Sequence, residues 1–322
     1  MAASLPEPAA RACERVRLAF RQWAPAEPQA PRVEGVLATG HANVTILLAG
    51  TGGRWVLRLA PGTAPLGVCR EREAAIHRLA AAAGLAPPLR YAEAHTGCLV
   101  TDYLPAAPQG DEASRAAPRK RSTSDMKSAS RQTRIAPIAH LIRRIHGLVP
   151  VDDGNARYGP ALNSVAQLSR WRRSLAGKDP LAALDPQDRA TLDAAAARLE
   201  ADRAEPVLCH NDLLAPNRLL RAGGLIAIDW EYACLGDAFF DLAVVASEFE
   251  DAEVAELLQS YLQRAPAEGE RQRLHDQQLV YGAIASCWYA AQDAAAAELG
   301  ASLDALQRQC RRATAPASSG AH

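Results

Sequence analysis

The chain has 322 residues, of which 48% are hydrophobic, and its 36 lysines and arginines are balanced by 36 aspartates and glutamates. This length and composition are typical of one large domain or two smaller ones with a real core. The zero formal net charge gives no reason to expect nucleic acid as a partner.

No run of about 18 apolar residues is present, so no membrane span is expected, and the N-terminus lacks the apolar stretch of a signal peptide. The seven cysteines are scattered, odd in number and without CxxC spacing. They indicate reduced thiols rather than a disulfide or zinc framework, and a cytoplasmic location.

The first part of the chain, residues 1–104, is expected to form a small sheet with a helix on it. Residues 8–23 have the spacing of an amphipathic helix, and VTILLAGTGGRWVLRLA contains two β-rich runs around GTGG, which is typical of a hairpin. REREAAIHRLAAAAGLAPP indicates a helix that ends at Gly84. GCLVTDYL then predicts a short buried strand.

Residues 105–134 interrupt this pattern. They lack aromatic residues and have almost no large aliphatic ones, so they bury too little apolar surface to offset the entropy of ordering. A mobile insert is expected here. Residues 135–322 are predicted to be mostly helical, apart from short strands in PVLCHN, NRLLR and LIAIDW. The fold class is therefore α+β.

Three polar residues stand in an otherwise apolar stretch, LCHNDLLAPNRLL at 208–220. They are His210, Asp212 and Asn217, and they lie on a predicted loop between two short strands. Asp229 follows the next apolar run, in IDWEYA. Loops between strands are where catalytic groups concentrate, so these four residues are candidates for a common site.

The pattern H-x-D-x-x-x-x-N followed by D-x-E resembles that of the protein-kinase-like phosphotransferases of small molecules. The residues within it are most similar to those of the choline/ethanolamine and thiamine kinase branch. GDAFFDLA at 236–243 also fits, with Asp241 where such proteins place an aspartate that supports the catalytic loop. The resemblance implies a bilobal fold, with a small N-terminal antiparallel sheet lobe and a larger helical lobe. It also implies a kinase that uses ATP and Mg²⁺.

Phosphoryl transfer requires positioning and charge neutralisation more than covalent chemistry. Asp212 is expected to accept a hydrogen bond from the substrate hydroxyl and orient it. Asn217 and Asp229 offer the hard oxygen ligands that Mg²⁺ prefers. His210 is expected to hold the catalytic loop by hydrogen bonds without titrating.

The N-terminal sheet is expected to cover the nucleotide. ATGHANVT at 38–45 stands where the phosphate-covering loop belongs, although its only glycine is Gly40. Small polar residues such as Asn43 let the backbone approach phosphate. TDYL, with Thr101 and Tyr103, is expected to be the hinge beside adenine.

Arg58, in WVLRLA, stands where the family has a strand lysine that holds the α- and β-phosphates. The forked donors of arginine suit the same task. Its expected carboxylate partner is Glu73, with Glu71 as the alternative by helix register.

Aromatic residues make up only 5% of the chain, yet two pairs occur near the expected site. Trp230 and Tyr232 flank Glu231 beside the metal motif, and Trp288 and Tyr289 follow later in the chain. Aromatic faces attract quaternary ammonium groups, and a carboxylate adds negative charge for a cation. A small cationic alcohol is therefore the expected acceptor.

Three functions remain open at this point. The first is an ATP-dependent kinase of an alcohol such as choline, ethanolamine or thiamine. The second is an aminoglycoside-type antibiotic kinase on the same scaffold, and the third is a nucleotide-binding regulator without catalysis. The sequence leaves the acceptor and the oligomeric state undetermined.

Overall fold

The computed structural model describes residues 7–39, 43–60, 62, 64–105, 123–149, 158–292 and 296–314. By their contacts the residues divide into two compact units. The first comprises Met1–Pro137, Gly147–Gly159 and Ala215–Cys234, and the second comprises Ile138–His146, Pro160–Leu214 and Leu235–His322. The IDWEYA motif therefore belongs to the first unit, although it lies within the sequence range 135–322.

A five-stranded antiparallel sheet forms the centre of the first unit, with strand order β1-β2-β3-β5-β4. The strands are β1 (Arg32–Thr39), β2 (Val44–Ala49), β3 (Arg54–Leu59), β4 (Leu89–Glu93) and β5 (Cys98–Asp102). The expected hairpin is β2–β3, where GTGG joins the two strands and Thr45 pairs with Arg58. This sheet and the helices that follow confirm the expected α+β class.

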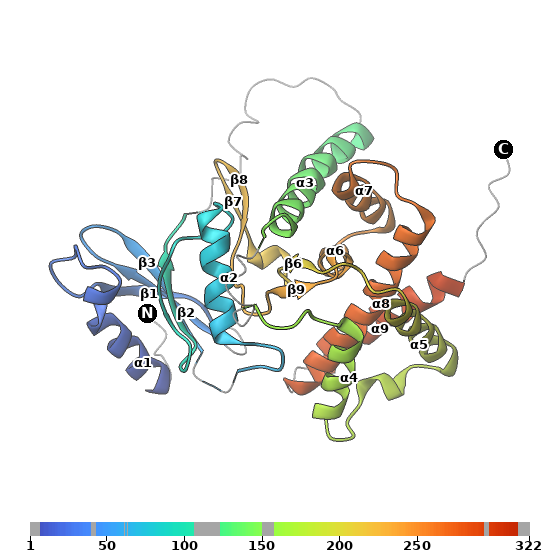
Figure 1. The fold of residues 1–322 in the computed structure, drawn as a ribbon, viewed down its shortest axis with the longest axis horizontal. Helices are drawn as coiled ribbons and strands as arrows, with labels where there is room; N and C mark the ends of the chain where they lie inside the picture. The colour runs from blue at the N-terminus through green and yellow to red at the C-terminus, as the bar shows by residue number, and fades with distance from the viewer. Residues whose placement is uncertain are drawn as a thin grey trace. The chain divides into compact units, whose positions relative to one another are not determined.

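Two helices pack on the sheet from opposite faces (Figure 1). The buried residues of α1 (Glu7–Leu18) join Trp23 and alternate residues of β2, β3 and β5 in one core. The helix predicted from REREAA is α2 (Arg70–Ala82), and Gly84, with φ of +69°, lies just after its end. A left-handed residue here suits glycine, because it has no Cβ to clash with the preceding carbonyl.

Helix α3 (Thr123–His146) begins inside the segment expected to be an insert. The part of this helix that was expected to be an insert contains serine, alanine, lysine and arginine but no glycine, a composition compatible with a helix. Low hydrophobicity alone therefore did not exclude a helix. The remaining part of that segment, from 106 to 122, lies outside the described residues.

Helix α8 (Glu268–Ala291) is central to the second unit, since it contacts α4, α5, α6 and α9. The other helices here are α4 (Ser164–Ser174), α5 (Pro186–Ala201), α6 (Ala238–Ala246), α7 (Asp251–Leu262) and α9 (Ala296–Thr314), and a short 3₁₀ turn, η3 (Pro180–Ala183), lies between α4 and α5. The 3₁₀ turns η1 (Phe20–Gln22) and η4 (Ala215–Asn217) belong to the first unit. Buried residues of α8 such as Leu279, Val280 and Ala283 form its packed side.

Four short strands carry the polar motifs. β7 (Arg218–Arg221) and β8 (Gly224–Ala227) form a hairpin in the first unit, and β6 (Val207–Cys209) pairs with β9 (Cys234–Gly236). His210 and Asp212 follow the end of β6, Asn217 is the last residue of η4, and Asp229 follows the end of β8.

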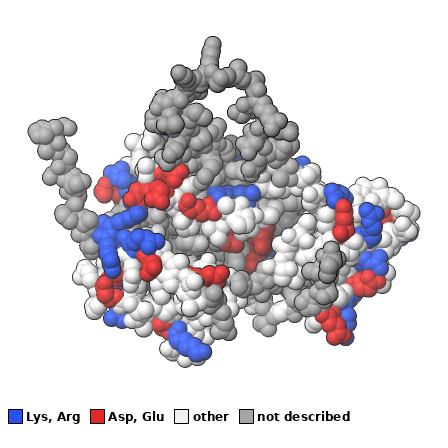
Figure 2. All heavy atoms as spheres, turned by 180° about the vertical axis from the view of Figure 1, so that it is seen from behind, with Lys and Arg blue, Asp and Glu red and all other residues white. Residues whose placement is uncertain are grey.

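Basic and acidic side chains are intermixed on the face drawn in Figure 2. Many are neighbours on one helix, such as Arg271 with Glu268. None of the seven cysteines forms a disulfide. In the part of the chain that the structure describes, no helix combines the length and hydropathy needed to cross a membrane.

The pH dependence of stability should reveal the ion pair that ties α1 to β4. Hydrogen bonds from Arg15, then from Thr96 and Tyr91, lower the pKa of Glu93 to about 2. A carboxylate with a lowered folded pKa stabilises the protein above its unfolded pKa of about 4.3, and this contribution disappears as the pH falls towards 2. The stability lost in Glu93→Gln should thus be largest near neutral pH and shrink below about pH 4.3.

Urea unfolding of the wild type and Glu93→Gln at pH 3 and pH 6 measures this difference. Glu71→Gln, at an exposed position of the same unit, is the matched control. A loss of stability that is the same at both pH values would contradict the assignment.

Candidate functional site

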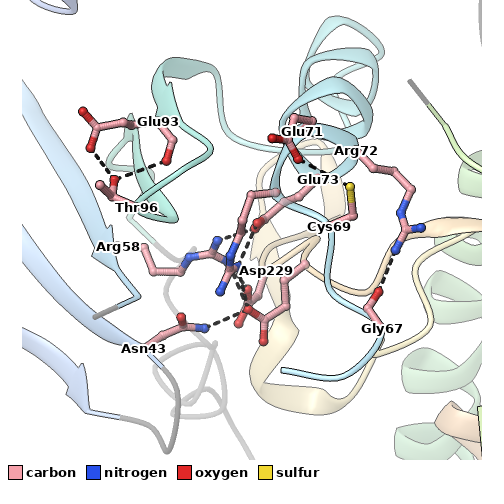
Figure 3. Close-up of polar contacts among 12 residues, drawn as sticks. Asn43, Arg58, Gly67, Cys69, Glu71, Arg72, Glu73, Glu93, Thr96 and Asp229 are labelled. Atoms are coloured by element: carbon pink, nitrogen blue, oxygen red, sulfur yellow. Dashed lines mark hydrogen bonds and ion pairs between the residues drawn. The ribbon is translucent and has the colours of Figure 1, made fainter. Parts of the chain in front are cut away.

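Five charged side chains of the first unit are linked by ion pairs, and Figure 3 shows Arg58, Glu73 and Asp229 among them. They come from one strand, one helix and the loop after β8, and are Arg58, Arg70, Glu73, Asp229 and Glu231. Two guanidinium groups thus face three carboxyl groups. From the sequence, Arg58 and Glu73 were predicted to bind nucleotide and Asp229 to bind metal. Arg70 was not predicted.

Arg58 occupies the centre of this cluster and forms ion pairs with both Glu73 and Asp229. Its side chain is 10% exposed and that of Glu73 is completely buried. Glu71 instead lies on the exposed side of α2, where its carboxylate contacts the Cys69 thiol at 3.6 Å. The geometry therefore selects Glu73 over Glu71 as the partner of Arg58.

Burial and neighbouring charges have opposite effects on the pKa values of the residues in the cluster. Burial lowers the pKa of Arg58, but the carboxylates of Asp229, Glu73 and Glu231 outweigh it and raise that pKa overall. Burial raises the pKa of Glu73, with Arg58 and Arg70 opposing it. Arg58 is consequently a fixed positive charge in a site with little water.

His77, on the same helix, adds no positive charge to this site. Burial, with a smaller contribution from Arg58, lowers the pKa of His77 to about 4. The ring is thus neutral near pH 7, and Nε2 lies 2.8 Å from the carbonyl oxygen of Pro87. Because a carbonyl only accepts, Nε2–H is the donor.

Asp229 has a left-handed backbone with φ of +61°, which is uncommon outside glycine. Such conformations concentrate at functional sites. The Asp229 side chain is 31% exposed, so an ion from solvent can reach it. The Asn217 carbonyl accepts the N–H of Ile228 at 2.9 Å, which places Asn217 beside the chain leading to Asp229.

Asn217 and Asp229 together offer amide and carboxylate oxygens, the hard donors that suit a divalent cation such as Mg²⁺. The guanidinium of Arg58 already contacts the Asp229 carboxylate, so this position accommodates a positive charge. The residues present therefore fit the metal that the sequence motif implies.

Two of the residues expected to bind the acceptor are corrected by the structure. Trp230 is completely buried and its indole N–H donates to the carbonyl of Ala227 at 3.1 Å, so its ring is a core group and not a wall for a cation. Glu231 is 6% exposed and its carboxylate pairs with Arg70 at 2.9 Å. Its negative charge is therefore already neutralised. Tyr232 remains partly exposed.

The residues expected to cover the nucleotide are placed as follows. Gly40 lies outside the described residues, and Asn43 Nδ2 donates to Glu231 at 3.1 Å. Thr101 lies in β5, paired with β3 and β4. The Tyr103 N–H donates to the Arg54 carbonyl at 3.0 Å, and the Arg54 guanidinium lies 4.9 Å from the Tyr103 ring centre.

The unit boundary falls between Leu214 and Ala215, so His210 and Asp212 belong to the second unit. His210 is completely buried. The Asp241 carboxylate accepts the backbone N–H groups of His210 at 2.8 Å and of Asn211 at 2.6 Å. Asn211 has φ of +63°, so Asp241 holds a left-handed turn directly before Asp212.

His146 forms a hydrogen bond with the carboxylate of Asp241. This role of His146 was not predicted from the sequence. Burial raises the pKa of Asp241, but the hydrogen bond and charge of His146 outweigh it and lower that pKa overall. His146 Nε2 lies 3.1 Å from the ionised carboxylate and donates to it, while Nδ1 lies 2.9 Å from the hydroxyl of Tyr261. The sequence feature that could have indicated this role is the segment HLIRRIHGL, whose last histidine ends an apolar helix.

Cys209 joins His146 and Asp241 in a cluster whose ligand atoms lie within 4.8 Å of one another. All three are engaged in hydrogen bonds: the Cys209 thiol contacts the carbonyls of Val207 and Asp237, both at 3.6 Å. The arrangement therefore serves as a hydrogen-bonded support for the turn before Asp212.

The charge of Asp212 acts on Tyr281 of the same unit. Burial raises the pKa of Tyr281 and the negative charge of Asp212 raises it further, while a hydrogen bond with Ser247 opposes them. Tyr289 packs edge-on against Trp288, with ring centres 5.2 Å apart, and both are partly exposed. Tyr281 precedes Trp288 by seven residues, a spacing that places both on the same side of a helix. This spacing could have marked Tyr281 as a candidate residue in the sequence.

Comparison with solved structures shows the fold of these elements in known enzymes. A choline/ethanolamine kinase family protein from Mesorhizobium loti aligns over 95% of each chain, with 19% identity and a TM-score of 0.67. LicA in complex with AMP aligns over 92% of this chain and 96% of its own, with 20% identity and a TM-score of 0.64. At these identities the likeness establishes the fold.

A third solved structure is the GDP and kanamycin complex of APH(2")-IIia, which has 13% identity and a TM-score of 0.64 and aligns over 93% of this chain and 99% of its own. Among curated proteins, Protein LicA of Haemophilus influenzae is 50% identical over 40 residues. That match spans 12% of this chain and 15% of LicA, so it is local. The model of the phosphotransferase enzyme family matches residues 35–276, which is more than half of the chain, and the chain therefore belongs to that family.

Proposed function

We propose that this phosphotransferase moves the γ-phosphate of ATP to the hydroxyl of a small cationic alcohol of the choline, ethanolamine or thiamine type. Family membership supports phosphoryl transfer, and the fold is that of proteins named as choline/ethanolamine kinases. The observation that carries the acceptor assignment is the pair of partly exposed rings, Trp288 and Tyr289, which pack edge-on with centres 5.2 Å apart in the unit that also holds Asp212.

The first unit supplies the nucleotide side. Arg58, held by Glu73, offers a forked set of donors to the α- and β-phosphates. Asn217 and Asp229 would hold Mg²⁺, which would neutralise phosphate charge. Arg58 exchanges its contact with Asp229 for contact with phosphate, because both are anions that the same guanidinium binds.

Asp212 supplies the acceptor side of the chemistry. Its carboxylate accepts a hydrogen bond from the substrate hydroxyl and aligns that oxygen with the γ-phosphate. Asp241 fixes the two backbone N–H groups before Asp212, so the carboxylate is oriented by the protein before the substrate arrives. His210 contributes through its place in this loop, where its backbone N–H donates to Asp241.

The aromatic wall of α8 suits a cationic acceptor. Trp288 and Tyr289 are partly exposed and pack edge-on against each other, and the partly exposed Glu248 adds a negative charge to the same unit. A desolvated cation over such a ring gains about 2 kcal/mol. The acceptor cation lies against these rings, with its hydroxyl towards Asp212.

The runner-up is an aminoglycoside kinase, which has the same fold. A polycationic antibiotic needs several available carboxylates. At the start of α7, however, Asp251 pairs with Arg312, and Glu250 and Glu253 form a capping box. These acids already have structural roles, which favours the smaller cation. A non-catalytic regulator would bind nucleotide without turnover.

Substitution of the two aspartates should separate their roles. Asp212→Asn removes the group that orients the hydroxyl but no metal ligand, so turnover should fall by at least about 100-fold while ATP binding persists. Asp229→Ala removes a metal ligand, so Mg²⁺-dependent nucleotide binding should be lost. Coupled detection of ADP and calorimetric binding of ATP measure the two effects. Near-wild-type turnover in Asp212→Asn would contradict its role.

The acceptor wall is tested with choline, ethanolamine, thiamine and kanamycin. Trp288→Ala removes a cation–π contact of about 2 kcal/mol, so the Michaelis constant for the cationic alcohol should rise about 30-fold. Trp288→Phe keeps an aromatic face and is the matched control, with a much smaller rise expected. Turnover of kanamycin alone, unaffected by Trp288→Ala, would establish the runner-up instead.

A further inference from the structure

Three metal-ligand groups of different chemistry meet in the interior of the second unit. They are an imidazole from the end of α3, a thiol from β6 and a carboxylate from α6, in His146, Cys209 and Asp241, and their ligand atoms lie within 4.8 Å of one another. Cys209 and Asp241 are completely buried, and the His146 side chain is 5% exposed. Nitrogen, sulfur and oxygen atoms of these side chains are the ligands that bind Zn²⁺ in proteins.

We propose that His146, Cys209 and Asp241 form a binding site for a thiophilic divalent cation such as Zn²⁺, and that this cation inhibits phosphoryl transfer. The site belongs to the second unit. It differs in chemistry from Asn217 and Asp229, whose oxygen atoms suit Mg²⁺, because sulfur selects softer metals. Inhibition rests on the proposed function, whereas binding of the cation does not.

The spacing of the three side chains is close to that of a tetrahedral zinc site. Bonds of about 2.0–2.1 Å to nitrogen and oxygen separate these two ligands by about 3.3 Å, and a bond of about 2.3 Å to sulfur places it about 3.6 Å from either. His146 Nε2 already lies 3.1 Å from Asp241 Oδ2. Since no two ligand atoms are more than 4.8 Å apart, Cys209 Sγ needs to approach by no more than about 1.2 Å.

Charges and protons balance when the cation binds. The Cys209 thiolate and the Asp241 carboxylate neutralise its two positive charges, which a buried ion requires. The thiol proton leaves to solvent as the bond to sulfur forms. The His146 ring gives up its proton at Nε2 and carries one at Nδ1, which lies 2.9 Å from the Tyr261 hydroxyl. A hydroxyl accepts as well as donates, so Tyr261 can hold this tautomer.

The cation would act on catalysis through Asp241. The same carboxylate oxygen, Oδ2, accepts the backbone N–H of His210 at 2.8 Å, and this contact helps to shape the turn before Asp212. A metal that draws Oδ2 towards itself weakens the contact, so Asp212 loses its orientation towards the acceptor hydroxyl. A misplacement of about 1 Å can cost about 100-fold in rate. Turnover should therefore fall while ATP binding persists.

Titration of the reduced, metal-free protein with Co²⁺ and then Zn²⁺ tests the site directly. A thiolate bound to Co²⁺ absorbs in the near ultraviolet, so one equivalent should produce this band in the wild type and Zn²⁺ should abolish it. Cys209→Ala should lose the band and weaken Zn²⁺ binding by more than about 100-fold, and Tyr261→Phe should weaken it about ten-fold. Cys287→Ala removes another buried thiol of the same unit and should behave as the wild type does.

X-ray absorption by the Zn²⁺ complex of the wild type gives an answer even if a variant fails to fold. One sulfur at about 2.3 Å, with nitrogen and oxygen at about 2.0–2.1 Å, is expected. Coordination without sulfur, coordination by two or more sulfur atoms, or a cobalt band that persists in Cys209→Ala would overturn the proposed site.

The inhibitory role is tested by ADP formation. Wild-type protein loaded with one equivalent of Zn²⁺ should form ADP at least about ten-fold more slowly than the metal-free protein, and a chelator should restore the rate. An unchanged rate in protein shown to hold Zn²⁺ would refute inhibition. If the metal-free wild type has no kinase activity, the proposed function fails, whereas the cobalt band and the zinc coordination would still establish the site.

Discussion

The buried guanidinium of Arg58 is the constraint on which the first unit depends. A charge removed from water is tolerated only when it is paired and hydrogen-bonded. Its partners come from distant parts of the sequence: Glu73 from α2 and Asp229 from the loop after β8. Satisfying one cation therefore fixes a strand, a helix and a hairpin against each other.

The same constraint distinguishes the cluster from an ordinary stabilising core. Replacing a buried ion network with apolar side chains is often neutral or favourable for stability, so stability alone does not explain its presence. Two further features point to function: the left-handed backbone of Asp229 and the exposure of its carboxylate. In the second unit, Asp241 plays the corresponding part, since its buried charge is satisfied by the backbone N–H groups that shape the turn before Asp212.

Sequence reasoning predicted the elements whose patterns are local. The β2–β3 hairpin, α2 and the polar motifs follow from turn residues, helical spacing and strand ends. It did not predict β1, whose residues are mostly exposed and whose pairing with β2 has two register shifts. It also did not predict the contact of His146 with Asp241, because partners distant in the chain leave no local pattern. Trp230 and Glu231 were misjudged since their side chains turn inward, which neighbouring residues in the sequence cannot reveal.

The central claim, phosphoryl transfer from ATP to a small cationic alcohol, is tested most directly by phosphorus-31 NMR. The purified protein is mixed with ATP, Mg²⁺ and, in separate samples, choline, ethanolamine, thiamine or kanamycin. The account predicts that ATP resonances decline while those of ADP and a new phosphomonoester of the alcohol grow together. Formation of ADP with inorganic phosphate only, or of a phosphomonoester with kanamycin only, would contradict it.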